Sequence, residues 1–428
     1  MPPGTGPGAS PPHDAPASPG STVSPAPLLG WCAVLMAFSC FTTQAGLNIA
    51  FCVACIGLVH RICRHGLQEL VGLPGADLPL GLYAFSFLLS STAGIDPMRS
   101  FEYGTEFKRI LIAYVVASSV RTTGEVIRLF GAVILGGLVN SALTFHQWAF
   151  VGTYARTNLT QTYEPFQLTQ PFGLASSCND LAGLLVQALG LAVAPALVVS
   201  LGPGRRAALG LIAATISLGI LRTGSRSGLV GALLALFITV LWYRPRLVPW
   251  IAAALALIYP LIPGSLTSRH FQIFDAKVKS NTFRLRMCEV SVQMARDHQP
   301  LGIGRRNFEP LHDKIRRPDE ELSPNAHNNY LNVMVEMGLL GVVSLIWFQC
   351  AVIRYLARQI GRADRSDLHR AALLGLFMAF VSFAIVGLFD FFWGFSMPVS
   401  LMWILVGTAY AVGEGNLLDG RAAAPASR

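Results

Sequence analysis

Charged residues are scarce in this chain. Asp, Glu, Lys and Arg make up 13% of its 428 residues, whereas a soluble globular domain carries roughly 25%. Apolar residues account for 53%, and the mean hydropathy is +0.51. So little charge in so long a chain excludes a single soluble domain and predicts a polytopic membrane protein.

The first 27 residues lack Lys and Arg altogether and are rich in Pro, Gly, Ala and Ser. A secretory signal peptide begins with a basic segment, so this composition argues against a signal peptide and predicts a disordered tail. The first hydrophobic segment is then expected to remain as a membrane helix.

The cysteines and acidic residues do not form a pattern typical of a metal site. Cys52 and Cys55 form a Cys-x-x-Cys pair, but they lie inside a hydrophobic segment and are interpreted as packing residues. The acidic run 319–321 is interpreted as solvated surface, and we find no Asp-x-Asp pair at the outer end of a span. We therefore expect no metal and no other cofactor. A disulfide between Cys178 and Cys288 remains an alternative.

Hydrophobic segments predict an all-α integral membrane protein with about twelve transmembrane helices. The expected spans are 28–43, 46–60, 79–94, 108–120, 126–150, 176–200, 206–221, 227–243, 247–262, 328–353, 369–388 and 397–413. The expected organisation is a tail at 1–27, nine helices within 28–262, a large partly helical loop at 263–326, three helices within 327–413, and a tail at 414–428.

The basic residues of short loops set the expected orientation, because such loops stay in the cytoplasm. Alternate loops carry Arg61 and Arg64, Arg121 and Arg128, Arg205 and Arg206, Arg244 and Arg246, and Arg354, Arg358, Arg362, Arg365 and Arg370. Both termini are therefore predicted to be cytoplasmic, and the 263–326 loop is predicted to lie on the outer side of the membrane.

Two arginines lie on that outer side in a short turn, where the rule disfavours them. Arg222 and Arg226 belong to Arg-Thr-Gly-Ser-Arg-Ser-Gly, and Arg226 opens the 227–243 helix. An arginine fork and a helix N-terminus both favour a phosphate group. Simple anchoring of the helix end is the alternative for either residue. For Arg226 the unusual placement favours binding.

The outer loop adds further candidates. Arg284 and Arg286 lie in a segment that fits a helix on the membrane surface only loosely. Either arginine is able to reach a lipid headgroup, and plain attraction to anionic lipid is an equal alternative. Arg156, in the 151–175 loop, is a candidate for lining an entry for a sugar or lipid.

His327 is the sharpest candidate for a catalytic residue. Pro324 breaks the chain, Asn325 or Ser323 is expected to cap the next helix, and His327 is then expected in the first turn of that helix. The helix dipole there favours a neutral imidazole, which accepts a proton from an attacking hydroxyl. A histidine that only hydrogen-bonds at the interface is the alternative.

Other residues of the outer side carry weaker signals. Nothing in the sequence fixes His298 or His312 to a span. The Gly302-Ile-Gly304 segment lacks the context of a dinucleotide site and is interpreted as a turn that lets the backbone approach a ligand or a helix. Asp390, in an aromatic stretch between the last two spans, is interpreted either as orienting an arginine or as a loop residue.

Together these motifs resemble the O-antigen ligase and polymerase superfamily of bacterial inner membranes. The resemblance rests on four segments: Thr223-Gly-Ser-Arg-Ser-Gly, Arg284-x-x-x-Cys288, Pro300-Leu-Gly-Ile-Gly-Arg-Arg-Asn-Phe308, and Asn325-Ala-His-Asn-Asn-Tyr330 running on to Gly341. The departures are Cys288, where the family commonly has an aromatic residue, and a spacing one residue short at Pro300-Leu-Gly302. Arg286 therefore remains a rival to Arg284.

The resemblance implies a membrane-embedded, metal-independent and inverting glycosyltransferase, active on the periplasmic face of the inner membrane. Its donor would be a glycan on undecaprenyl pyrophosphate, and its acceptor a sugar hydroxyl of lipid A–core. Carried onto this chain, it implies His327 as base and Arg226 and Arg284 as phosphate contacts, with Asn328 as a further candidate substrate contact. We expect membrane lipids as partners and no nucleic acid.

Three other functions remain open. An O-antigen polymerase uses the same donor and joins it to another lipid-linked glycan. A protein O-oligosaccharyltransferase shares the histidine pattern, but often has a sizeable outer domain after the last span. A secondary transporter would suit the number of spans, but its polar groups should lie near mid-membrane. The charged candidates here lie at the outer edge.

Overall fold

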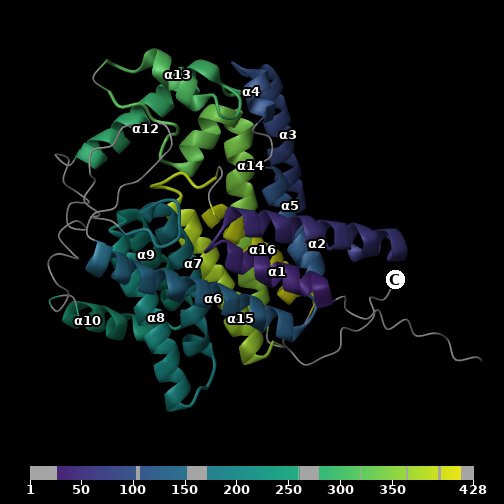
Figure 1. Cartoon of the computed structure of the whole chain (residues 1–428), viewed down its shortest axis with the longest axis vertical. Coiled ribbons are helices and arrows are strands. Elements are labelled where there is room, and N and C mark those ends of the chain that lie inside the picture. Colours follow the sequence, from purple (N-terminus) through teal and green to yellow (C-terminus); the bar gives the residue numbers. More distant parts are fainter. Residues whose placement is uncertain are drawn as a thin grey trace, which may run out of the picture.

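The computed structural model describes residues 27–102, 107–151, 171–258, 260, 279–318, 320–362, 365–393 and 397–415. Within these ranges every regular element is helical (Figure 1). In chain order the helices are α1 (Pro27–Ser39), α2 (Gln44–His65), η1 (Leu67–Glu69), α3 (Asp77–Ala93), α4 (Pro97–Glu102), α5 (Phe107–Ser119), α6 (Thr123–His146), η3 (Gln147–Val151), α7 (Cys178–Val198), α8 (Pro203–Thr223), α9 (Arg226–Tyr243), η4 (Pro245–Leu247), α10 (Val248–Ile258), α12 (Lys279–His298), α13 (Phe308–Ile315), α14 (Asn329–Ile360), α15 (Asp367–Val386) and α16 (Met397–Gly415).

Each of the twelve expected spans corresponds to one of these helices. Eight are long and apolar enough to cross a membrane: α2, α6, α7, α8, α9, α14, α15 and α16. The other four, α1, α3, α5 and α10, have 13, 17, 13 and 11 residues. The predicted class, an all-α integral membrane protein, is confirmed. Both predicted tails lie almost entirely outside the described residues.

The centre of the bundle is the pair α7 and α15, which are buried over nearly their whole length. Small residues allow their backbones to meet. A Cβ on Gly190 would lie 2.7 Å from the backbone nitrogen of Ala379, and one on Gly375 would lie 3.3 Å from the Gly190 oxygen. Helices in a membrane associate through this kind of close packing, because lipid gives them little hydrophobic drive.

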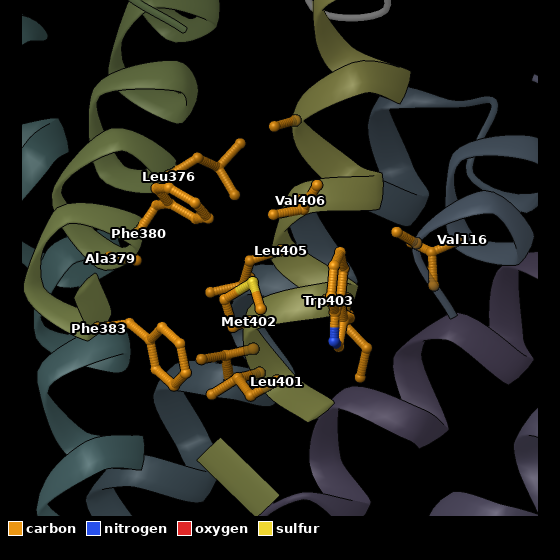
Figure 2. Close-up of a cluster of buried hydrophobic side chains, with 14 of the residues drawn as sticks. Val116, Leu376, Ala379, Phe380, Phe383, Leu401, Met402, Trp403, Leu405 and Val406 are labelled. Atoms are coloured by element: carbon orange, nitrogen blue, oxygen red, sulfur yellow. The ribbon is translucent and has the colours of Figure 1, made fainter. Parts of the chain in front are cut away.

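Helix α16 closes the bundle between α15 and α5. Figure 2 shows Phe380 and Phe383 of α15 on one side of α16 and Val116 of α5 on the other. Trp403 of α16 packs against the ring of Phe348 of α14, with 5.0 Å between ring centroids. This apolar layer holds α16 against its neighbours.

Helices α7, α9, α14 and α16 begin at one end of the bundle. The backbone N–H of Asn329, the first residue of α14, donates to Gly387 O at 2.8 Å, just after α15 ends. A Cβ on Gly228 of α9 would lie 2.6 Å from Ala182 of α7, and one on Gly183 of α7 would lie 3.0 Å from Pro398 of α16. Helix α12 lies at this end too, at the top of Figure 1, and we call it the α12 end.

Basic residues of the alternate short loops gather at the opposite end. Arg61 and Arg121 both pair with Glu69. Arg244 donates to Leu197 O at 3.3 Å, and Arg365 donates to Gly413 O at 2.6 Å. The structure thus separates two ends as the charge pattern requires, while the side of the membrane on which each end lies remains a prediction.

Helix α12 packs on protein, which corrects the expectation of a helix lying on the membrane surface. Its buried residues Met287, Val290, Met294 and Ala295 form a second core with Ile303, Phe308, Ala326 and Val335. Leu285 of the same helix is exposed. The tertiary partner is α14, so the segment supports the start of that helix.

The Gly302–Gly304 turn was expected to approach either a ligand or a helix, and in the structure it approaches a helix. Gly302 and Gly304 both have positive φ, 79° and 84°. The N–H groups of Ile303 and Gly304 donate to Val335 O and Glu336 O, each at 2.9 Å. Helix α14 breaks its helical geometry at Gly338, where φ is 70° and a Cβ would overlap the Pro300 carbonyl oxygen. The loop is therefore joined to α14 by backbone contacts that only glycine permits.

A buried ion pair reinforces this junction. Arg305 pairs with Glu336, and both residues are 2% exposed. The other oxygen of Glu336 accepts the backbone N–H of Arg306 at 2.9 Å. Removing one partner would leave a buried charge uncompensated, so the pair fixes the loop relative to α14.

Candidate functional site

Helix α14 begins two residues after His327, and Asn328 is its cap. The Asn328 side chain accepts hydrogen bonds from the backbone N–H groups of Tyr330 and Leu331 at 2.9 and 3.0 Å. The expected cap at Ser323 or Asn325 is therefore wrong, and His327 lies just before the cap rather than in the first turn. The Asn328 amide also donates to Leu388 O at 2.8 Å, so this side chain is occupied by structural contacts.

His327 points toward Asp390. Its Nδ1 lies 3.6 Å from Oδ1 of Asp390, and 26% of its side chain is exposed. Among the described residues Nδ1 has no hydrogen-bond partner, and the distance exceeds an ordinary hydrogen bond by a few tenths of an ångström. Catalytic hydrogen bonds are often long in the absence of substrate. The arrangement holds Nδ1 toward the carboxylate and leaves Nε2 for another partner.

Arg284 reaches the same carboxylate from α12. Its Nη2 lies 3.3 Å from Oδ2 of Asp390, and Nη1 donates to the Phe389 carbonyl. The ring of Phe283 meets the His327 ring edge to face, with centroids 5.7 Å apart. Asp390 therefore orients an arginine, which was one of the two interpretations of this residue. It also faces the candidate base.

Both neighbours act on the acidity of Asp390. Burial alone raises the pKa of this carboxyl, but contact with His327 and the charge of Arg284 outweigh burial. The pKa of Asp390 therefore lies below its usual range. An ionised carboxylate is the form that steadies a histidine as it takes up a proton.

Arg286 is directed elsewhere. Its Nε donates to Glu320 at 2.9 Å, and its Nη1 to Glu289 at 3.2 Å. Two carboxylates thus balance its charge, whereas Arg284 shares one carboxylate with His327. Of the two rivals, the structure brings Arg284 and not Arg286 to the histidine.

Arg222 is buried at the end of α8. It is 8% exposed, and its guanidinium carbon lies 3.7 Å from the ring centroid of Trp148. Among the described residues neither Nε nor Nη2 has a hydrogen-bond partner. A buried guanidinium held on an indole face, with two donors unused, suits an anion that arrives from outside the chain.

Arg226 is the first residue of α9, whose cap is Ser225. The Ser225 hydroxyl accepts from Gly228 N at 3.3 Å. Helices α7, α9, α14 and α16 all begin at the α12 end, and α14 begins two residues after His327. Helix N-termini attract anions by this geometry.

The remaining candidates are Arg156, the pair Cys178 and Cys288, and the acidic run 319–321. Arg156 lies outside the described residues. The structure forms no disulfide between Cys178 and Cys288. Glu320 of the acidic run pairs with Arg286, and the part of the chain that the structure describes holds no group of three or more His, Cys, Asp or Glu suited to a metal ion.

Sequence reasoning missed His312. This residue looked unattached, yet it is fully buried and its Nδ1 accepts the backbone N–H of Ser323 at 3.1 Å. The only signal in the sequence was its spacing from Phe308, which places both on one face of α13. His298 is bound more simply, through Nδ1 to Met294 O within its own helix.

Comparison with known proteins gives one family match, over part of the chain. No curated protein sequence matches the chain. Residues 211–346, about a third of the chain, match the family model described as O-Antigen ligase. The match runs from α8 to α14 and contains Arg222, Arg226, Arg284 and His327. This segment is therefore similar to the O-antigen ligase family.

Proposed function

We propose that this protein is an O-antigen ligase. It transfers a glycan from undecaprenyl pyrophosphate to a sugar hydroxyl of lipid A–core, on the periplasmic face of the bacterial inner membrane. The observation that carries the proposal is the meeting of His327, Asp390 and Arg284 at the α12 end, beside the start of α14. The family match over 211–346 supports the reaction class.

His327 acts as the general base. Its Nδ1 faces the ionised Asp390, so Nε2 takes the proton of the acceptor hydroxyl as the oxygen attacks the anomeric carbon. The bond from that carbon to the pyrophosphate oxygen breaks, and undecaprenyl pyrophosphate leaves with the electron pair. Direct attack from the opposite face inverts the configuration. Asp390 stabilises the imidazolium until its proton passes to water.

Arg226 and Arg284 bind the pyrophosphate. Charge grows on its oxygens as the glycosidic bond breaks, and fixed cations placed there stabilise the transition state. Arg284 is already held by Asp390, and Arg226 lies at the positive end of α9. Arg222 on Trp148 supplies a third cation with unused donors. These groups supply positive charge that a divalent metal would otherwise bring, so we propose a metal-independent reaction.

The test is glycan transfer with purified components. Wild type, His327→Ala and Arg226→Ala are mixed with undecaprenyl-pyrophosphate glycan and lipid A–core in detergent containing a chelator. Glu309→Gln serves as the matched control, because Glu309 lies on α13 and pairs with Arg99, away from His327. We expect a glycan ladder on lipid A–core from wild type and Glu309→Gln, and loss of the ladder in both other variants.

Each alternative gives a different product. Longer lipid-linked glycan with unmodified core would identify a polymerase, and glycan on a protein acceptor an oligosaccharyltransferase. Folded protein that transfers nothing, but moves a solute into vesicles, would identify a transporter. Activity that survives His327→Ala would refute the base, and activity abolished by the chelator would refute the metal-independent reaction.

A further inference from the structure

His312 is a fully buried histidine whose hydrogen bond defines its tautomer. It lies on α13 beside Phe308, with 6.1 Å between ring centroids. Its Nδ1 accepts the backbone N–H of Ser323. A backbone N–H is only a donor, so Nδ1 carries the lone pair and the neutral ring holds its proton on Nε2. Among the described residues Nε2 has no partner, so the ring serves this segment as an acceptor.

Ser323 opens a short chain of hydrogen bonds that ends at His327. The Ser323 hydroxyl donates to Asn325 O at 2.7 Å, and the Asn325 side chain accepts the backbone N–H of His327 at 2.9 Å. Ala326 N donates to Asn332 at 3.0 Å, which ties the middle of the segment to α14. The segment 323–327 is therefore fixed at both ends.

The backbone of His327 needs such support. Its φ is +50°, a conformation that costs a residue with a side chain some free energy and persists only when neighbours impose it. The direction of the imidazole follows from this conformation. If Ser323 lost its acceptor, the segment could relax and the ring would turn away from Asp390.

Charged groups around His312 secure the same loop. Glu320 accepts from Arg286 Nε at 2.9 Å and from Arg317 N at 3.1 Å. Arg316 Nη1 donates to Glu320 O at 2.9 Å. Arg286 therefore acts on the loop between α13 and Ser323, which explains why it is turned away from His327.

We propose that His312 is a positioning residue for the candidate base, acting through Ser323 and Asn325 on the direction of the His327 ring. It does not touch substrate. The expected effect on turnover rests on the proposed function. The expected effect on the conformation of the 323–327 segment does not.

Two substitutions of His312 separate the effect of losing the hydrogen-bond acceptor from the effect of losing the imidazole ring. In His312→Asn the amide oxygen occupies the branch position of Nδ1 and accepts the Ser323 N–H. In His312→Leu the apolar volume remains, but the acceptor is lost. Ser323→Ala is the companion variant, because it keeps the N–H bonded to His312 and removes only the next link to Asn325.

Turnover and binding are measured separately, at a temperature below the thermal midpoint of every variant. For His312→Leu we expect kcat to fall roughly 10- to 100-fold, because a small misplacement of a catalytic group has this effect. The KM for the lipid-linked donor should stay near wild type, since Arg226 and Arg284 are untouched. His312→Asn should recover most of the turnover, and Ser323→Ala should lie between the two.

Hydrogen exchange measured by mass spectrometry gives a readout that needs no activity. Peptides covering 323–327 should exchange faster in His312→Leu than in wild type, and His312→Asn should restore protection. Equal turnover or equal protection in the Leu and Asn variants would overturn the inference, whether both match wild type or both fall. If wild type transfers no glycan but the exchange pattern holds, the proposed function fails and the positioning role stands.

Discussion

At the scale of single residues, His327 acquires a role from Asp390, a residue far along the chain. The sequence marked the histidine through its place before a span and left two interpretations for the aspartate. Only the fold brings Nδ1 of one within 3.6 Å of Oδ1 of the other and adds Arg284 to the same carboxylate. Asp390 then links the candidate base to a candidate phosphate contact.

Asp390→Asn should separate charge from shape at this position. The amide keeps the size of the side chain, but it cannot stabilise an imidazolium or balance Arg284. We expect kcat for glycan transfer to fall about tenfold or more, and less than in His327→Ala, because the base itself remains. Steady-state transfer assays measure both values. Wild-type kcat in Asp390→Asn would show that His327 works without the carboxylate.

Arg222→Gln should weaken binding of the donor without lowering the stability of the protein. The substitution removes a cation from the proposed donor site, so the KM for the lipid-linked donor should rise about tenfold, the equivalent of one charged hydrogen bond. It also removes a buried charge whose desolvation no described carboxylate offsets, so the thermal midpoint should not fall.

Arg206→Gln is the matched control for this prediction, because Arg206 is exposed at the opposite end of the same helix. It should change neither KM nor midpoint. A lower midpoint with unchanged KM in Arg222→Gln would show that Arg222 only stacks on Trp148 to hold the bundle together.

At the scale of elements, the glycines of the outer loop show what a local pattern is able to predict. The Gly302-Ile-Gly304 segment indicated a turn that approaches a ligand or a helix, and the partner turned out to be α14. The break in α14 at Gly338 was not predicted, because an isolated glycine in an apolar span carries no such signal. It follows from the Pro300 carbonyl, which occupies the space of a Cβ.

Gly338→Ala should therefore loosen the junction between the 300–304 turn and α14. Alanine at φ +70° is strained by about 1–3 kcal/mol, and its Cβ would overlap Pro300 O as well. We expect a clear drop in thermal midpoint in detergent and a loss of transfer. Gly210→Ala in α8 is the control, because a Cβ there meets nothing within 4 Å and alanine favours a helix. An equal effect of the two substitutions would contradict the packing described here.

The loop from α13 to Ser323 should weaken as the pH falls. Burial lowers the pKa of His312 below 6.5, and contacts with Arg317 and Arg286 lower that of Glu320 against the effect of burial. A group with a lowered pKa in the fold contributes stability above its unfolded pKa and loses it on acidification. The His312 contribution is thus complete above about pH 6.5 and declines below it.

Thermal midpoints measured between pH 7.5 and 5 test this prediction. The midpoint should fall with acidification, and the fall should be shallower in His312→Asn, which cannot titrate. The charged groups that face His312, whether its ring is neutral or protonated, are Glu320, Arg316 and Arg286. A midpoint that rises on acidification would contradict the assigned sign.

At the scale of the whole molecule, the bundle has two chemically different ends. Basic residues of short loops pair with carboxylates and backbone at one end, and the candidate site lies at the other. The positive-inside rule then predicts a cytoplasmic basic end and a periplasmic α12 end. The basic residues that define one end of the bundle and the candidate site residues at the other end are different sets. The two observations therefore support the same orientation independently.

Surface labelling tests this orientation directly. Lys314 is exposed on α13 and Arg206 is exposed at the start of α8, and each is basic. In intact spheroplasts a membrane-impermeant maleimide should label Lys314→Cys above the wild-type background. Arg206→Cys should react only after the membrane is permeabilised. The reverse pattern would invert the topology and exclude a periplasmic site.

The sequence by itself determined the membrane class, the helices and the residue types of the site, because hydrophobic length, charge placement and turn residues act locally along a chain. It also indicated His327 and Arg226. The tertiary structure alone placed Arg284 rather than Arg286 beside the histidine, gave Asp390 two partners, and linked His312 by hydrogen bonds to the segment of the candidate base. Those choices depend on contacts between segments far apart in the chain, and such contacts exist only once the helices have packed.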